Sequence, residues 1–333
     1  MKPLILGVSG PVLTDAERER LAAHRPAGII LFARNVEAPD QVRTLTDSLR
    51  DCCGDDLLVL IDQEGGRVQR LRPPHWRDHP PGAAFGRLYD IGPMTAIEAA
   101  RLHGHAIAAE LVPLGVNAPC LPLIDVPVAG AHDIIGDRAF SRDPMWVAAL
   151  GAAVLRGLRE GGVAGIIKHI PGHGRAGADS HEELPVVTAD AAALEQDLAP
   201  FRALNDAPMA MTAHVRYDAW DAERCASISP KVIGDVIRGD IGFDGLLMCD
   251  DLAMHALGGE LVTRMNDALA AGCDVALHCT GEADANATLL RAAPEMTETA
   301  QRRWKAALGW PAAEPSPEAK AADRRDELLA IAA

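Results

Sequence analysis

Residues 57–61 read LLVLI, a run of five aliphatic side chains that is followed at once by the polar residues DQE at positions 62–64. A strand with no polar position must be covered on both faces, which is typical of a parallel sheet flanked by helices. Seven more short apolar segments share this pattern and span residues 4–8, 28–32, 116–121, 164–168, 209–212, 245–249 and 274–278. The sequence therefore predicts eight buried strands of one sheet.

Amphipathic stretches lie between most of these apolar segments and carry apolar residues at helical spacing. The clearest cover residues 14–23, 38–50, 94–114, 144–160, 189–204 and 261–271. Eight strands that alternate with helices predict the α/β class and a single (β/α)8 TIM-type barrel, with its active site at the carboxyl ends of the strands. We expect this catalytic domain to span residues 1–310, and residues 311–333 to form a Pro/Ala-rich spacer at 311–317 and a charged helix at 318–329.

The composition indicates a globular protein with an acidic surface. The 333 residues include 32 Lys and Arg against 47 Asp and Glu, a formal net charge of −15, so the surface repels nucleic acids and anionic membranes. No apolar stretch approaches the roughly 18 residues that span a bilayer, and the N-terminus shows no secretion signal, which predicts a cytoplasmic protein. Seven cysteines without a C-x-x-C pair predict reduced thiols rather than disulfides or a thiolate zinc site.

The segment that follows the strand at 57–61 reads DQEGGRVQR and ends at position 70. Its paired glycines allow a tight turn, which would bring the carboxylate of Asp62 and the guanidinium of Arg70 together. Such a pair either binds a small ligand, for which the rigid fork of arginine is suited, or is a structural ion pair beside a turn. The residues alone leave both interpretations open.

A loop that begins KHIPGHG at residues 168–174 follows the fifth apolar segment. Its histidines His169 and His173 are four residues apart, a spacing that binds zinc when both lie on one helix. The proline and glycine between them prevent that helix, so we expect no metal ion and no other cofactor. Three histidines, a lysine and an aspartate between positions 168 and 181 nevertheless favour a functional site over packing.

The same loop continues to Asp179 and His181, which are two residues apart. A carboxylate that accepts a hydrogen bond from one imidazole nitrogen orients the ring and raises its basicity, and the other nitrogen is then available to transfer a proton. The pair therefore predicts a general acid/base. The glycine and proline content of the loop also predicts that it closes over a bound ligand.

Asp250 and Asp251 follow the apolar segment 245–249 and should reach the mouth of the barrel. An aspartate there is a candidate nucleophile or metal ligand, and the alternative is a cap for the following helix. Both interpretations are compatible, with Asp250 facing the mouth and Asp251 serving the helix start. Arg138 and His214 are further candidates, with a surface arginine and a hydrogen-bonded core histidine as the alternatives.

Taken together, these segments resemble the bacterial β-N-acetylglucosaminidases of glycoside hydrolase family 3. The resemblance rests on IDQEGGRVQRL at 61–71, IGDRAFS at 135–141, KHIPGHG at 168–174, DSHEELP at 179–185, MTAHV at 211–215, CDDLAM at 249–254 and AGCDVAL at 271–277. In order and spacing it runs from about residue 4 to 280, and the combination of K-H-x-P-G-H-G with D-S-H is very specific. Ile170 and Cys249 replace the usual phenylalanine and serine, but neither is a proposed reacting group.

The resemblance implies a retaining exo-glycosidase that removes terminal β-linked N-acetylglucosamine. It matches the nucleophile of the family to Asp250, its acid/base histidine to His181, and the partner of that histidine to Asp179. The sugar-binding positions match Asp62, Arg70, Arg138, Lys168 and His169. The implied substrate is a 1,6-anhydro-N-acetylmuramoyl peptide of peptidoglycan recycling, and we expect a monomer or weak homo-oligomer to bind this muropeptide or a similar small carbohydrate.

The implied chemistry differs from the usual one in a single group. Retaining glycosidases usually carry two carboxylates about 5 to 5.5 Å apart, and here a histidine takes the place of one. Imidazole, with an ordinary pKa of about 6.5, suits an acid that later becomes a base near neutral pH. Because imidazole does not repel phosphate as a carboxylate does, some phosphorolysis beside hydrolysis is a further expectation. Glu182 or Glu183 is the rival proton donor.

Two functions of other classes remain as alternatives. A Schiff-base aldolase would use Lys168, which would need a desolvated pocket to lower its pKa, yet His, Pro and Gly follow it rather than an apolar wall. A non-catalytic sugar-binding protein on the same scaffold would be expected to lack Asp250 or His181, and both are present.

Overall fold

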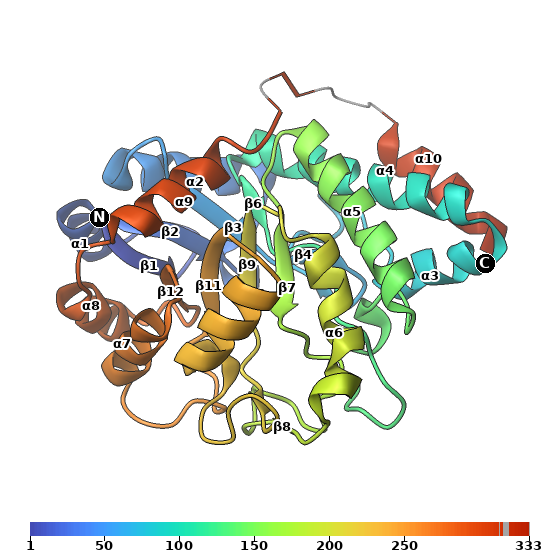
Figure 1. Ribbon diagram of the computed structural model, residues 1–333. Helices are drawn as coiled ribbons and strands as arrows, with labels where there is room; N and C mark the ends of the chain where they lie inside the picture. Colours follow the sequence, from blue (N-terminus) through green and yellow to red (C-terminus); the bar gives the residue numbers. More distant parts are fainter. Residues whose placement is uncertain (313, 316–319, 333) are drawn as a thin grey trace.

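Eight parallel strands surround a common axis in the computed structural model, which describes residues 1–312, 314–315 and 320–332 (Figure 1). Their bounds are Lys2–Gly7 (β1), Pro26–Leu31 (β2), Leu58–Ile61 (β3), Ala118–Pro119 (β6), Ile166–Ile170 (β7), Met209–Thr212 (β9), Leu246–Asp251 (β11) and Val275–His278 (β12). They pair in the order β6-β3-β2-β1-β12-β11-β9-β7. A parallel bridge between Leu123 and Lys168 joins the two ends of this order. The predicted (β/α)8 barrel is confirmed.

Helices cover the outside of the barrel. They are α1 (Asp15–His24), α2 (Pro39–Cys53), α3 (Gly82–Ile91), α4 (Pro93–Leu111), α5 (Pro144–Gly161), α6 (Ala191–Ala203), the π-helix η5 (Val232–Asp240), α7 (Leu261–Ala271), α8 (Ala283–Ala292), α9 (Glu298–Leu308) and α10 (Ala321–Leu329). Single 3-10 turns are η1 (Ala33–Asn35), η2 (Val112–Leu114), η3 (Gly136–Arg138), η4 (Ala226–Ile228) and η6 (Ala330–Ala332). All six helices predicted between the strands are present, whereas α3, η5, α8 and α9 were not predicted.

Two small sheets lie outside the barrel. One is the antiparallel pair β4 (Gln63–Gly65) and β5 (Val68–Gln69), and the other is the parallel pair β8 (Val186–Val187) and β10 (Arg216–Tyr217). The first pair follows β3 directly and is part of the loop that carries Asp62 and Arg70. It therefore fixes how these two residues face each other.

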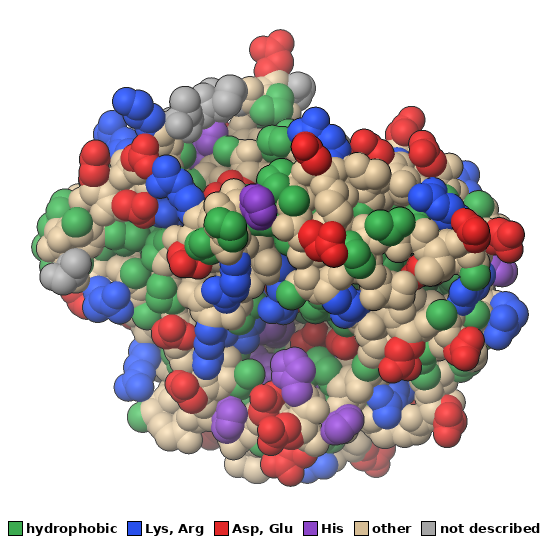
Figure 2. Space-filling view, turned by 180° about the vertical axis from the view of Figure 1, so that it is seen from behind, with side chains coloured by type: hydrophobic (Ala, Val, Ile, Leu, Met, Phe, Trp, Pro, Cys, Tyr) green, Lys and Arg blue, Asp and Glu red, His purple; other side chains and the backbone are tan. Residues whose placement is uncertain are grey.

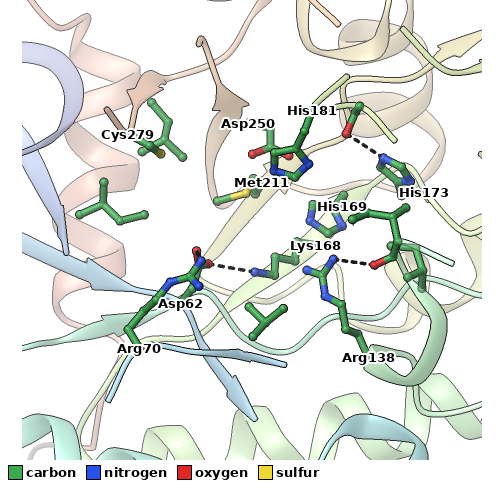
Figure 3. A pocket seen from close by; sticks show the side chains of 16 residues that line it. Asp62, Arg70, Arg138, Lys168, His169, His173, His181, Met211, Asp250 and Cys279 are labelled. Atoms are coloured by element: carbon green, nitrogen blue, oxygen red, sulfur yellow. Dashed lines mark hydrogen bonds and ion pairs between the residues drawn. The ribbon is translucent and has the colours of Figure 1, made fainter. Parts of the chain in front are cut away.

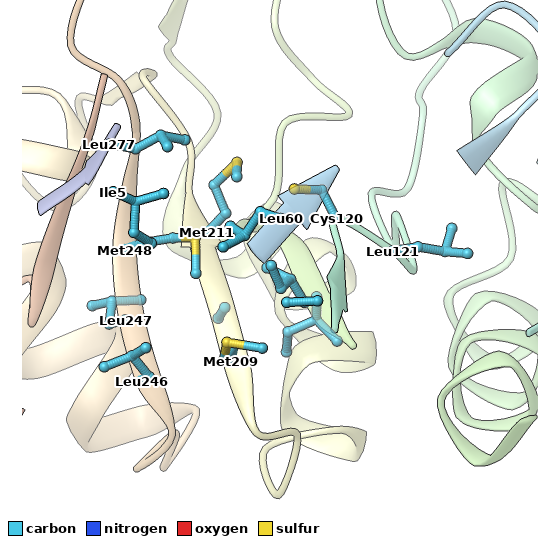
Figure 4. Packing of buried hydrophobic residues seen from close by; sticks show 14 of the residues in the cluster. Ile5, Leu60, Cys120, Leu121, Met209, Met211, Leu246, Leu247, Met248 and Leu277 are labelled. Carbon is cyan, nitrogen blue, oxygen red and sulfur yellow. The ribbon is translucent and has the colours of Figure 1, made fainter. Parts of the chain in front are cut away.

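The interior of the barrel is filled by the apolar side chains of its strands. Leu60, Met209 and Met248 are fully buried and belong to one continuous hydrophobic cluster (Figure 4). Burial of this kind stabilises the fold in proportion to the apolar area removed from water. The packed interior gives the polar residues at the strand ends a rigid base.

The strand predicted at 116–121 is shorter than expected, with only Ala118–Pro119 in regular pairing. Pro119 and Pro122 have no N–H to donate to a neighbouring strand, so the ladder is interrupted there. All seven cysteines are thiols, as predicted. Among the described residues, no helix has the length and apolarity that a membrane crossing requires.

The C-terminal helix α10 packs against α4, beside the C label in Figure 1. Ala321 enters a small apolar cluster with Leu102 and Ala106 of α4. The spacer predicted at 311–317 falls in part on positions 313, 316 and 317, which lie outside the described residues, as does the start of the predicted helix at 318 and 319. The boundary at residue 310 stays a prediction.

Candidate active site

A cleft of about 710 Å³, its open mouth included, lies at the carboxyl ends of the strands. Figure 2 shows a hollow near the middle of this face with basic and histidine side chains around it. Seven of the eight predicted site residues line the cleft: Asp62, Arg70, Arg138, Lys168, His169, His181 and Asp250 (Figure 3). The eighth, Asp179, contacts His181 from behind. The structure thus brings together residues that are far apart in the sequence.

Asp62 follows β3 and is held between two cations. Its Oδ2 accepts a hydrogen bond of 2.8 Å from Arg70, and the Nζ atom of Lys168 lies 3.3 Å from its Oδ1. Burial raises the pKa of Asp62, but Lys168 and Arg70 outweigh this effect and hold the pKa below its usual range. The carboxylate is therefore ionised and oriented, as a group that accepts hydrogen bonds from sugar hydroxyls must be.

Glu64 is a second buried carboxylate of the site, which we did not single out from the sequence. Its Oε1 lies 2.6 Å from Nζ of Lys168 and 2.7 Å from Nη2 of Arg138, and its side chain is 5% exposed. Burial raises its pKa, but the two ion pairs outweigh this and lower the pKa to about 2. Glu64 lies two positions after Asp62 and, like it, contacts Lys168. A second carboxylate in the segment DQE at 62–64 is the sequence signal that points to it.

The ion pairs of Glu64 predict a specific dependence of stability on pH. Because its pKa falls from 4.5 to about 2 on folding, the folded state gains stability above pH 4.5 and loses it as the pH drops through that interval. Glu64→Gln removes the titrating group. We expect its Tm to be lower than that of the wild type at pH 7, because two buried cations lose their partner, but to change less between pH 4.5 and 2.

Thermal unfolding at a series of pH values checks this expectation. Glu182→Gln is the matched control, since Glu182 is exposed and the substitution should leave the wild-type profile unchanged. Parallel profiles for the wild type and Glu64→Gln would contradict the assignment of that stabilisation to Glu64.

Asp125 supports the histidine loop from below and was also not predicted. It is fully buried, and its Oδ2 lies 2.7 Å from Nδ1 of His169. Its Oδ1 accepts hydrogen bonds from the backbone N–H groups of His169, at 3.2 Å, and His173, at 2.6 Å. Burial raises the pKa of Asp125, but its pairing with His169 outweighs this and lowers it. Because an ionised carboxylate can only accept hydrogen bonds, Nδ1 of His169 carries a proton and donates it to Asp125 in a hydrogen bond. The Nε2 atom of His169 is then the ring nitrogen that is left for a second hydrogen bond.

His173 lies beside His169, with ring centroids 5.6 Å apart. Burial and the neighbouring imidazole lower the pKa of His173 to about 4, so the ring is neutral at pH 7. Its Nε2 lies 3.2 Å from the hydroxyl of Ser180, a contact that ties the two parts of the loop together. Within the described part of the chain, no group of three or more His, Cys, Asp or Glu side chains is arranged to hold a metal ion.

His181 and Asp179 form the hydrogen-bonded pair that the sequence predicts. The Nδ1 atom of His181 lies 2.7 Å from Oδ1 of Asp179, and the same oxygen accepts the backbone N–H of His181 at 2.9 Å. The imidazole is 66% exposed and lines the cleft, where its Nε2 is available to a ligand. Glu182 and Glu183 are exposed, and neither lines the cleft.

Asp250 is the next-to-last residue of β11 and lines the same cleft as His181 (Figure 3). Its Oδ1 accepts the backbone N–H of Asp251 at 2.8 Å, and it forms no ion pair with any described residue. Burial raises its pKa, but the imidazoles of His214 and His169 outweigh this and lower it. Asp250 is therefore an ionised carboxylate with no cation bound to it, as a nucleophile requires.

The prediction that Asp251 caps the following helix is wrong. Its Oδ1 accepts hydrogen bonds of 3.0 Å from the backbone N–H groups of Ala253 and Cys279, whereas helix α7 begins only at Leu261. A loop, rather than a helix, follows β11. Asp251 therefore connects the ends of β11 and β12 beneath the cleft.

His214 matches the alternative of a core histidine. It is fully buried, its Nδ1 lies 2.7 Å from the hydroxyl of Ser227, and its Nε2 lies 3.0 Å from the carbonyl oxygen of Asp251. Both ring nitrogens thus have partners inside the protein. His214 supports the backbone next to Asp250 and does not line the cleft.

Comparison with known proteins assigns the family. The model described as "Glycosyl hydrolase family 3 N terminal domain" matches residues 6–306. The chain belongs to glycosyl hydrolase family 3. It is therefore a glycoside hydrolase, which excludes a non-catalytic sugar-binding protein.

Relatives in this family are similar over most of their length. A β-hexosaminidase of Bordetella avium is 39% identical over 282 residues, which cover 83% of this chain and 80% of that protein. A β-hexosaminidase of Aromatoleum aromaticum is 38% identical over 316 residues, 93% of this chain and 88% of that protein. The structure of NagZ from Neisseria gonorrhoeae in complex with N-trifluoroacetyl-D-glucosamine has a TM-score of 0.90 at 31% identity, covering 100% of this chain and 98% of that one.

The surroundings of Lys168 also exclude the Schiff-base aldolase. Burial lowers the pKa of Lys168, but Glu64 and Asp62 outweigh this and raise the pKa above its ordinary value. An ammonium held between two carboxylates stays protonated, whereas an amine that attacks a carbonyl must be neutral. Lys168 is therefore a hydrogen-bond donor of the cleft.

Proposed function

We propose that this glycoside hydrolase is a retaining exo-β-N-acetylglucosaminidase. The observation that carries the proposal is that an ionised aspartate, Asp250, and a solvent-accessible imidazole, His181, line one cleft. The names of the relatives, which are β-hexosaminidases, and the N-acylglucosamine bound to NagZ support the substrate class.

In the first step, a carboxylate oxygen of Asp250 attacks C1 of the sugar while the bond from C1 to the leaving oxygen breaks. His181 gives its Nε2 proton to that oxygen, and a covalent glycosyl-aspartate forms. In the second step, the same nitrogen takes a proton from water as the water oxygen attacks C1, which releases the sugar and restores both residues. Asp179 orients the ring and stabilises its charged form.

The sugar is held by groups whose positions are fixed before it binds. Asp62, Arg70, Arg138, Lys168 and His169 line the cleft. We propose that these side chains bind the hydroxyl and N-acetyl groups. Glu64 and Asp125 hold Lys168 and His169 in place from below. Because these dipoles and charges need no reorientation as the reaction proceeds, they stabilise the transition state more effectively than water does.

The resemblance to family 3 β-N-acetylglucosaminidases, which indicates the sugar, also indicates the class of natural substrate. A 1,6-anhydro-N-acetylmuramoyl peptide carrying a terminal N-acetylglucosamine is our proposed substrate, cleaved in the cytoplasm during peptidoglycan recycling by a monomer or weak homo-oligomer. The proposal includes closure of the loop after β7 over bound sugar. A loop that is equally protected from hydrogen exchange with and without N-acetylglucosamine would contradict closure.

Product analysis by NMR tests the proposed function. With an aryl N-acetyl-β-glucosaminide, we expect free N-acetylglucosamine to appear first as the β anomer, because two successive inversions at C1 retain the configuration. A disaccharide with N-acetylglucosamine only at the reducing end and galactose at the non-reducing end serves as the matched negative substrate. An α anomer as first product, or release of a different sugar, would contradict the proposal.

The same assay in phosphate buffer tests a second expectation. His181 carries no negative charge that repels an anion, so phosphate can take the place of water in the second step and release N-acetylglucosamine 1-phosphate. We expect this product beside free N-acetylglucosamine, in an amount that rises with phosphate concentration. Its absence in concentrated phosphate would rule out phosphorolysis.

A further inference from the structure

The C-terminal helix α10 carries a buried arginine. The side chain of Arg325 is 1% exposed, although that of its neighbour Arg324 is exposed. Asp326 lies 2.7 Å from Nη2 of Arg325, and Arg77 pairs with Asp323 of the same helix at 2.7 Å. A buried guanidinium is unfavourable unless its donors find partners. The groups that Arg325 contacts beneath α10 therefore determine the position of this helix.

Two buried imidazoles lie beneath Arg325. Its Nη1 is 2.7 Å from Nδ1 of His79 and 3.2 Å from Nδ1 of His103. A guanidinium can only donate, so both Nδ1 atoms accept, and each neutral ring carries its proton on Nε2. Burial and then the charge of Arg325 lower the pKa of His103 well below its ordinary value. The protonation state of His103 thus depends on a side chain of α10.

The Nε2 proton of His103 points toward the active site. That nitrogen lies 3.0 Å from the carbonyl oxygen of Glu64 and donates to it. The carboxylate of the same residue binds Lys168 at 2.6 Å and Arg138 at 2.7 Å. Glu64 is therefore held from two sides, its backbone by His103 and its side chain by two cations that line the cleft.

We propose that Arg325 is a positioning residue of the active site. It keeps His103 as the neutral Nε2–H tautomer, which fixes the backbone of Glu64 and, through its carboxylate, Lys168 and Arg138. Helix α10 lies outside residues 6–306, the range that the family model matches. The predicted effect on sugar binding rests on the proposed function, whereas the predicted effect on the order of segment 63–69 does not.

Hydrogen exchange of the ligand-free protein tests the structural link. Arg325→Met removes the donors but keeps an unbranched side chain, and Arg324→Met removes one charge from the exposed side of the same helix. We expect faster amide exchange in segment 63–69 for Arg325→Met and wild-type exchange for Arg324→Met. Equal exchange of this segment in all three proteins would overturn the proposal.

Kinetics with an aryl N-acetyl-β-glucosaminide test the consequence for the site. Loss of one buried hydrogen-bonded contact corresponds to a change of about tenfold in an equilibrium constant. For Arg325→Met we expect this change in KM. The value of kcat should change by less than about threefold, because Asp250 and His181 are not displaced. Arg325→Lys, whose ammonium also donates to Nδ1, should restore much of the loss. A fall in Tm with unchanged KM would show a merely structural role and overturn the proposal.

A double-mutant cycle decides whether Arg325 acts through His103. If it does, His103→Gln and Arg325→Met combined should raise KM no more than the larger single effect, whereas independent effects would multiply. Multiplying effects would overturn the proposed route. Should the wild type fail to hydrolyse the glycoside, the proposed function is wrong, and the exchange measurement alone then decides whether Arg325 orders segment 63–69.

Discussion

Replacing Asp250 by alanine is expected to lower kcat on an aryl N-acetyl-β-glucosaminide by on the order of 10⁴-fold, because removal of a nucleophile leaves only the catalysis that binding and fixed dipoles supply. The fold should remain intact, since Asp250 forms no ion pair with any described residue and accepts a hydrogen bond only from the adjacent backbone. Steady-state kinetics and thermal unfolding of the same preparation check both parts. Near-normal hydrolysis by this variant would refute the assignment.

Two comparisons make the Asp250 experiment specific. Asp47→Asn, on the exposed side of α2, is the matched control and should keep wild-type kinetics. Azide added to Asp250→Ala should occupy the space left by the carboxylate and attack C1 of an activated aryl glycoside, which gives the α-glycosyl azide. A β-glycosyl azide would instead indicate that another residue acts as the nucleophile.

Replacing His181 by alanine is expected to act according to the leaving group. A positioned acid contributes about 10²- to 10⁴-fold, and only a poor leaving group such as a sugar alkoxide needs the proton. We therefore expect a large loss of kcat/KM on an N-acetylglucosaminyl disaccharide and a much smaller loss on a dinitrophenyl glycoside. The two kcat/KM ratios of variant to wild type are the measurement.

The rival donors Glu182 and Glu183 give the control for His181. Both are exposed and neither lines the cleft, so Glu182→Gln and Glu183→Gln should hydrolyse the disaccharide at nearly the wild-type rate. Equal losses for His181→Ala on both classes of glycoside, together with a selective loss in one of the glutamate variants, would move the acid role to that glutamate.

The barrel was predictable because its strands are almost purely apolar. A segment such as LLVLI at 57–61 has no exposed position, so only a sheet covered on both faces can accommodate it. Helices α3 and η5 were missed because glycines and β-branched residues weaken the helical signal of their sequences. Helix α3 packs against α4 and η5 against η4, and no local pattern reports such contacts.

The site was predictable where a polar residue directly follows an apolar run, as Asp62 follows 57–61 and Asp250 follows 245–249. Asp125 was missed because it lies in an irregular segment, and its role depends on contacts with His169 and His173 more than forty positions away. The expectation for Asp251 failed for the same kind of reason. Its partner, the backbone of Cys279, follows the neighbouring strand β12, and only the closed barrel brings the two together.

The central claim is that Asp250 becomes covalently bonded to the sugar, and trapping that bond tests it most directly. In His181→Ala, a dinitrophenyl N-acetyl-β-glucosaminide can still react with Asp250, whereas water is no longer activated, so the glycosyl-enzyme should accumulate. Mass spectrometry of the quenched protein should show one added N-acetylglucosaminyl group, located on the peptide that contains Asp250. An unlabelled protein during turnover, or a label on any other residue, would contradict the account.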